Sequence, residues 1–89
     1  MTAERVEMIR QRLTDALQPE SLDIEDDSAS HAGHASAGGG GHFNVIIVSD
    51  RFTDLNLIKR HRLVYEAVDD MMNTEIHALS IKAYSPGEF

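Results

Sequence analysis

The stretch that decides the fold is HFNVIIVS at residues 42–49. Its apolar side chains alternate between two faces: Phe43, Val45 and Ile47 on one, Ile46 and Val48 on the other. A strand with apolar residues on both faces is typical of a central strand, or of a strand covered at least partly on each side. We therefore expect residues 42–49 to form the central strand of a small sheet.

Two weaker strand patterns flank this stretch. Residues 21–25 (SLDIE) and 75–84 (EIHALSIKAY) alternate apolar and polar side chains, which predicts half-buried strands. Residues 29–41 (ASHAGHASAGGGG) are small and glycine-rich, and predict a flexible loop longer than a hairpin needs. The last five residues, 85–89 (SPGEF), predict a loose C-terminal tail.

Two helices are predicted from apolar residues that recur at steps of three and four. The first covers residues 4–17, with Thr2 as its N-cap and Pro19 just beyond its end. The second covers residues 57–72 and carries His61 on its apolar stripe. Each helix therefore presents one apolar face that must be buried against another element.

The element order helix, strand, strand, helix, strand predicts a single α+β domain over residues 1–89. The two strands around the loop should pair antiparallel. The strand–helix–strand unit over residues 42–84 should make a right-handed crossover, so its strands should be parallel. Both helices would then cover one face of a three-stranded mixed sheet.

Composition narrows the classes of function. A chain of 89 residues forms one modest core and leaves little room for an enclosed substrate pocket, so we expect neither an enzyme nor a small-molecule substrate. Cysteine is absent, so the chain itself offers no disulfide or thiol chemistry. The formal net charge of −7 opposes general binding to nucleic acid. No signal peptide or membrane span is apparent, which favours a cytoplasmic location without a membrane partner.

Five histidines are the chemically distinctive residues: His31, His34, His42, His61 and His77. The spacing of His31 and His34 would allow them to chelate a metal, although histidines are also common in solvated loops. His77 shares a strand face with apolar residues, and this position alone favours a buried or half-buried histidine bonded to backbone. His61 fits a core position, and His42 simply opens a strand.

Four motifs resemble the BolA family, in matching order and spacing over nearly the whole chain: DDSASHAGH at 26–34, HFNVIIVSDRF at 42–52, RHRLVYEAV at 60–68 and IHALSIKAYSP at 76–86. The resemblance implies an α–β–β–α–β fold similar to a type II KH domain. It also implies an adaptor that binds a monothiol glutaredoxin and shares a [2Fe–2S] cluster with it, in iron–sulfur trafficking or iron sensing.

Carried onto this chain, the resemblance implies that His77 is the strand ligand and His31 the loop ligand, with His34 as its competitor. The glutaredoxin and its glutathione would supply the thiolates, so this cysteine-free chain is of the histidine-loop type. Imidazole must be deprotonated to bind metal, so cluster binding should weaken in acid. The isolated chain should bind metal only weakly, because it offers imidazoles and no thiolates.

The resemblance also supports an alternative function, a DNA-binding transcription regulator that uses the KH-like fold. The basic residues available for it are Arg51, Lys59, Arg60 and Arg62. One departure counts against it: the glycine run Gly38–Gly41 leads into a strand, whereas the GXXG loop of KH domains joins two helices. The sequence leaves open the oligomeric state and the downstream target.

Overall fold

The computed structural model describes residues 2–27, 41–72 and 74–88. Its helices and strands, in chain order, are α1 (Thr2–Leu17), β1 (Ser21–Asp26), β2 (Gly41–Val48), α2 (Leu57–Ala67) and β3 (Ile76–Tyr84). The described residues also form three short 3₁₀ turns: η3 (Asp50–Phe52), η4 (Asp69–Met71) and η5 (Pro86–Glu88). The predicted order of helices and strands is confirmed. The predicted loop lies outside the described residues, apart from Gly41, which begins β2.

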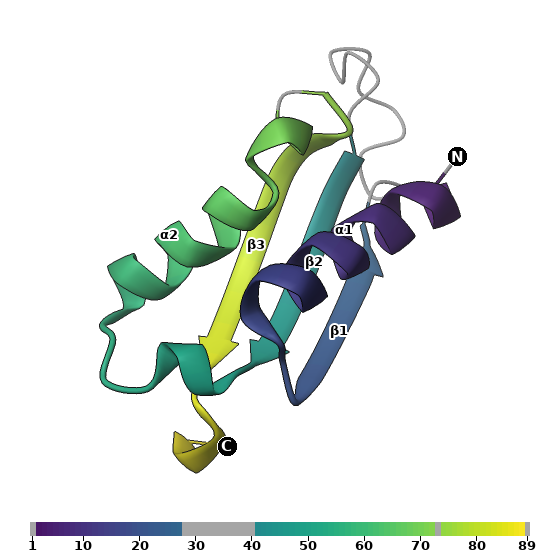
Figure 1. Cartoon of the computed structure of the whole chain (residues 1–89). Helices are drawn as coiled ribbons and strands as arrows, with labels where there is room; N and C mark the ends of the chain where they lie inside the picture. The colour runs from purple at the N-terminus through teal and green to yellow at the C-terminus, as the bar shows by residue number, and fades with distance from the viewer. Residues whose placement is uncertain (1, 28–40, 73, 89) are drawn as a thin grey trace.

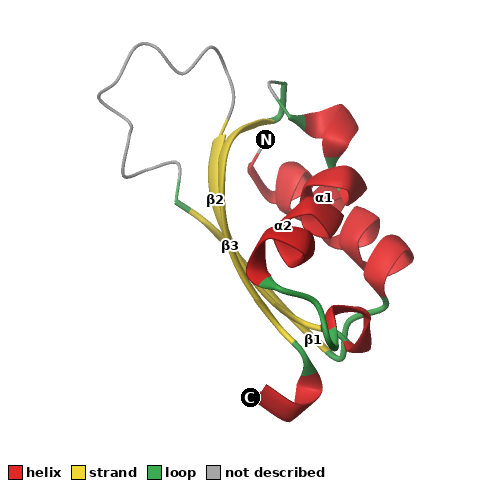
Figure 2. Cartoon of the chain, turned by 90° about the vertical axis from the view of Figure 1, so that its left-hand side faces the viewer, coloured by secondary structure: helices red, strands yellow, loops and turns green. Residues whose placement is uncertain are grey.

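The sheet has the order β1-β2-β3, with β2 in the centre as predicted. β1 pairs antiparallel with β2, and β2 pairs parallel with β3. Both helices lie on the same face of the sheet, and no described helix or strand covers the opposite face, which is called the uncovered face below (Figures 1 and 2). The predicted three-stranded mixed sheet with helices on one face is therefore confirmed.

The core fills the space between the helices and the covered face of the sheet. From β2 the side chains of Phe43, Val45 and Ile47 enter it, and all three are almost completely buried. They meet apolar residues of the helices, among them Ile9 and Leu13 of α1. Each such side chain contributes about 1.5–3 kcal/mol when it leaves water. The alternation that predicted a central strand is thus the pattern that builds the core.

The uncovered face of the sheet is largely polar. β1 and β3 present exposed side chains on it, including Asp23, Glu25 and Lys82. The side-chain amide of Asn44 in β2 donates a hydrogen bond of 2.9 Å to Glu25 Oε1 across the β1–β2 pair. A single layer of helices is therefore enough to bury the apolar side of this sheet.

α1 begins earlier than predicted, whereas its end at Leu17 is the predicted one. The helix begins at Thr2, so Thr2 is its first residue and not its N-cap. It ends at Leu17, before Pro19, with Gln18 in the left-handed region at φ 46°. The buried hydroxyl of Ser49 donates a 2.6 Å hydrogen bond to the Leu17 carbonyl. A residue 32 positions away thus caps the helix.

α2 is shorter than predicted. The Asn56 side chain caps its start by accepting a 2.9 Å hydrogen bond from Lys59 N. The helix ends at Ala67 and not at residue 72, because the chain tightens into η4. Val68 and Met71 stay buried through this turn, whereas Leu57 is 64% exposed. Among the described residues no helix is long and apolar enough to cross a bilayer.

Candidate functional site

His77 lies on a β-bulge near the start of β3. Gly41 pairs with Ile76 and the next residue, His42, pairs with Ala78, so His77 is an extra residue in the ladder. Ile76 and Leu79 are both buried, at 0% and 9% exposure, and His77 between them is exposed. The interpretation of His77 as a buried or half-buried histidine is wrong. The bulge shifts the alternation by one residue and leaves the imidazole in solvent.

A hydrogen-bonded turn holds the chain just before His77. The Gly41 amide donates a 3.0 Å bond to the Glu75 carbonyl. The Thr74 hydroxyl lies 2.6 Å from Glu75 Oε1 and 2.9 Å from the Met71 carbonyl oxygen. The Thr74 hydroxyl, more than any other group, lowers the pKa of the Glu75 carboxyl. These contacts give β3, and the histidine on it, a fixed starting point.

The segment that carries His31 and His34 is attached at the same end of the sheet. The Asp27 amide donates a 2.8 Å hydrogen bond to the carbonyl of His42, the second residue of β2. The segment therefore leaves the end of β1 next to the start of β2. β2 and β3 are parallel, and both start at this end (Figure 1). His31 and His34 themselves lie outside the described residues.

The other two histidines are placed elsewhere on the molecule. His42 is partly exposed on the uncovered face of the sheet, where its Nε2 lies 3.5 Å from Ser80 Oγ. His61 is partly exposed on α2, so it is not a full core residue. Within the described ranges no group of three or more His, Cys, Asp or Glu side chains could hold a metal ion. A metal centre that includes His77 therefore needs ligands from outside these ranges.

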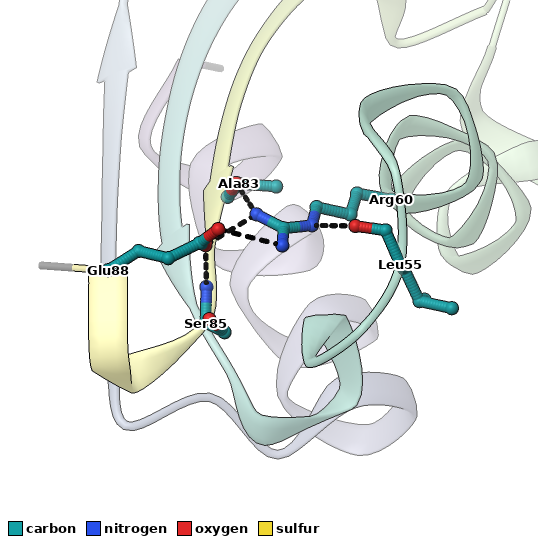
Figure 3. A network of polar contacts seen from close by, with 5 residues as sticks. All are labelled: Leu55, Arg60, Ala83, Ser85 and Glu88. Carbon is teal, nitrogen blue, oxygen red and sulfur yellow. Dashed lines mark hydrogen bonds and ion pairs between the residues drawn. The ribbon is translucent and has the colours of Figure 1, made fainter.

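The buried side chain of Arg60 links α2 to the C-terminus (Figure 3). At 7% exposure its guanidinium donates to the carbonyl oxygens of Leu55 at 2.8 Å and Ala83 at 3.1 Å. It also donates to both carboxylate oxygens of Glu88, at 2.6 and 3.0 Å. Glu88 in turn accepts a 2.8 Å bond from the Ser85 amide. The expectation of a loose tail is thus wrong for residues 85–88.

The electrostatics of this pair reflect its hydrogen bonds. Donation from Arg60, followed by donation from the Ser85 amide, lowers the pKa of Glu88 to about 2. The same contact with Glu88 raises the pKa of Arg60. The guanidinium is therefore engaged within the protein, and Arg60 does not fit the role of a phosphate contact.

Three of the four basic residues proposed for nucleic-acid binding remain on the surface. Arg51 in η3 and Lys59 and Arg62 in α2 are all exposed. Lys59 and Arg62 are three residues apart and so lie on the same side of the helix. Beside them, Leu57 and Ile58 are exposed at 64% and 70%. This surface is smaller than the one that the sequence predicted, because Arg60 is buried.

These features define a class: small α+β proteins with a mixed three-stranded sheet and a solvent-exposed histidine at the start of the last strand. The chain belongs to the BolA family, since the family model of the BolA-like protein matches residues 13–88.

Curated relatives and solved structures agree with this assignment. The chain is 49% identical over 86 residues to SufE-like protein 1 and 47% identical over 88 residues to BOLA1, both of Arabidopsis thaliana. The matches take in 90% and 94% of this chain, but only 23% and 55% of those proteins. The solved BolA domain of Arabidopsis SufE1 superposes with a TM-score of 0.85 at 46% identity, over 96% of this chain and 95% of that one.

A bacterial relative has a name that states a function. The chain is 37% identical to the DNA-binding transcriptional regulator BolA of Escherichia coli, over 93% of this chain and 77% of that protein.

The solution structure of mouse BolA1 superposes with a TM-score of 0.78 at 38% identity, over 94% of this chain and 67% of that one.

Proposed function

We propose that this protein binds a monothiol glutaredoxin and completes a [2Fe–2S] cluster shared with it. The observation that carries the proposal is the exposed His77 on its bulge, at the end of the sheet where the histidine-bearing segment is attached. His77 is the strand ligand and His31 the loop ligand. The thiolates come from the glutaredoxin and glutathione, because this chain has no cysteine.

Chain length favours His31 over His34 as the loop ligand. His31 follows Asp27 by four residues, so its Cα lies at most about 14 Å from that anchor at full extension. His34 is seven residues from both Asp27 and Gly41, which allows about 25 Å. Of the two, His31 is the more closely tethered to the described part of the chain.

The ligand set supports a role in cluster transfer or iron sensing. When the cluster is bound, the imidazole nitrogens of His77 and His31 would raise its reduction potential above that of an all-thiolate cluster. This chain would bind the cluster through His77 and fix the orientation of that side chain. The bulge directs His77 outward, and the Thr74–Glu75 turn holds the backbone just before it. Acid should release the cluster, because a protonated imidazole does not bind metal.

The first test is the His77→Ala variant. The cluster is reconstituted on a monothiol glutaredoxin with glutathione, and this protein is titrated in while the visible circular dichroism is recorded. We expect a new, stoichiometric spectrum with the wild-type chain and none with His77→Ala. The variant should keep the wild-type Tm, because the side chain is exposed.

His61→Ala is the matched control, since it removes a partly exposed imidazole from a different element. It should give the wild-type spectrum. A wild-type spectrum from His77→Ala would contradict the proposal, and so would unfolding of that variant, which would instead point to a structural histidine.

A second prediction separates the two histidines of the segment. His31→Ala should alter the cluster spectrum more than His34→Ala, because His31 is the proposed ligand. The same titration measures both variants. The reverse order would assign the ligand role to His34.

DNA binding is a second candidate function, favoured by the names of the Escherichia coli and Vibrio cholerae relatives. On this chain it would use Arg51, Lys59 and Arg62. Lys59→Ala and Arg62→Ala should each weaken binding to duplex DNA and lower the slope of log K against log salt by about 0.9. Fluorescence anisotropy measures both, with the exposed Lys82→Ala as the control. Equal losses in all three variants would contradict this surface.

A further inference from the structure

The two outer edges of the sheet differ in their hydrogen bonds. Along β3, two side chains of α2 donate hydrogen bonds to backbone carbonyls: the Tyr65 hydroxyl to Leu79 O at 3.3 Å, and Arg60 to Ala83 O at 3.1 Å. The Tyr84 carbonyl instead accepts from the Ser49 amide on the β2 side. Carbonyls alternate along a strand, so those of Leu79 and Ala83 point to the outer edge, which is therefore partly capped.

At Leu22 and Ile24 the outer edge of β1 has no strand partner among the described residues. The hydrogen bond from Asp27 N to His42 O sets the phase of the antiparallel ladder, in which residues facing the partner alternate with residues facing away. Leu22 and Ile24 therefore direct their N–H and C=O groups outward. In the sheet formed by the described residues, β1 pairs with β2 alone. Unpaired strand edges are templates for a further strand.

The side chains of β1 specify what kind of strand would fit. Residues 20–27 read ESLDIEDD, which is five carboxylates with no lysine, arginine or proline. Asp23 and Glu25 are exposed on the uncovered face. Leu22 and Ile24 are half-buried and pack against the core on the other face. Charged side chains and proline protect edge strands from unwanted pairing. The charges on this edge are all negative, so they oppose an acidic strand and favour a basic one.

We propose that the outer edge of β1 binds an extended segment of a partner protein in which lysine or arginine alternates with apolar residues. The segment would add a fourth strand through main-chain hydrogen bonds. Its cationic side chains would lie beside Asp23 and Glu25, and its apolar side chains would extend the layer formed by Leu22 and Ile24. The net charge of −7 would speed the encounter with such a segment.

Charge excludes the nearest competing occupants. A second copy that paired with β1 about a two-fold axis would place Asp23 or Glu25 opposite a carboxylate, which destabilises a cross-strand pair. Residues 28–40 of the same chain contain no lysine or arginine, so they lack the matching charge. A partner segment that alternates basic and apolar residues matches both faces of β1: the acidic Asp23 and Glu25 on one, and the apolar Leu22 and Ile24 on the other. This proposal does not depend on the cluster, since β1 and β3 are opposite edges.

The test uses a short, end-blocked peptide of alternating lysine and valine with a fluorescent label. Anisotropy measures its affinity for the full chain, and amide chemical shifts locate it. We expect the largest shifts at Leu22 and Ile24. The double variant Asp23→Lys/Glu25→Lys should weaken binding by about tenfold. Asp15→Lys/Glu66→Lys makes the same change in net charge on exposed helix positions and should keep most of the affinity.

Two further peptides sharpen the result. A peptide N-methylated on alternate residues should fail to bind, because it cannot complete the ladder, and an alternating glutamate–valine peptide should bind only the double variant. Absence of binding, equal binding of the N-methylated peptide, equal losses in both double variants, or shifts centred on α2 or β3 would each overturn the proposal. His77→Ala should bind the peptide normally, which separates this proposal from the cluster proposal.

Discussion

Arg60→Met is expected to lower the Tm by several degrees, whereas Arg62→Met, two residues along the same helix, should leave it nearly unchanged. Methionine retains an apolar stem but has no donors, so the carbonyls of Leu55 and Ala83 lose their partner, as does Glu88. Buried acceptors without donors are costly. Arg62 is exposed, and surface substitutions have small effects.

Thermal unfolding followed by far-UV circular dichroism compares the two variants. Arg60→Lys should fall between Arg60→Met and wild type, because an ammonium keeps the charge but cannot form the forked contact. Equal Tm values for Arg60→Met and Arg62→Met would contradict the proposed importance of this network.

The same ion pair predicts a dependence of stability on pH. The pKa of Glu88 in the folded state, about 2, lies below its ordinary value of 4.5. Its contribution to stability is therefore complete above about pH 4.5 and is lost as the pH falls toward about 2. Glu88→Gln should lower the Tm at neutral pH and flatten its decline in acid. Glu66→Gln, an exposed change on α2, should keep the wild-type profile.

Phe43→Ala is expected to lower the free energy of unfolding by about 3–5 kcal/mol, because it removes a fully buried ring from the centre of the core. A small domain has only about 5–15 kcal/mol in total, so the variant should be partly unfolded at moderate temperature. Urea unfolding measures the loss. Asn44→Ala, the next residue on the uncovered face, is the control and should cost much less. A loss below about 1 kcal/mol for Phe43→Ala would contradict the central position assigned to this strand.

Sequence reasoning predicted the sheet well because its signal is local. The alternation in residues 42–49 identified the central strand, and helical spacing identified both helices. The predicted end of α2 was wrong because Val68 and Met71 keep a helical spacing through a 3₁₀ turn. The capping of the C-terminal end of α1 could not be predicted, since Ser49 comes from a distant part of the chain.

The candidate site was only partly predictable, for similar reasons. The alternation of β3 placed His77 with apolar neighbours, because a bulge arises from pairing with β2 and leaves no mark in the strand's own sequence. Arg60 was assigned to a basic surface from its neighbours Lys59 and Arg62. Its spacing of four residues before Val64 was the signal that it faces inward. Nothing in residues 85–89 alone indicated that Glu88 would meet it.

The direct pairing of Asp27 with His42 has a consequence for how this protein can be modified. The strands on either side of residues 28–40 are already joined at their ends by the ladder, so the intervening chain is not needed to bring them together. Segments of other lengths or other ligand residues should therefore be accepted at this junction. Replacing residues 28–40 should therefore change the ligands proposed for the cluster, while the requirements for folding stay with the rest of the sequence.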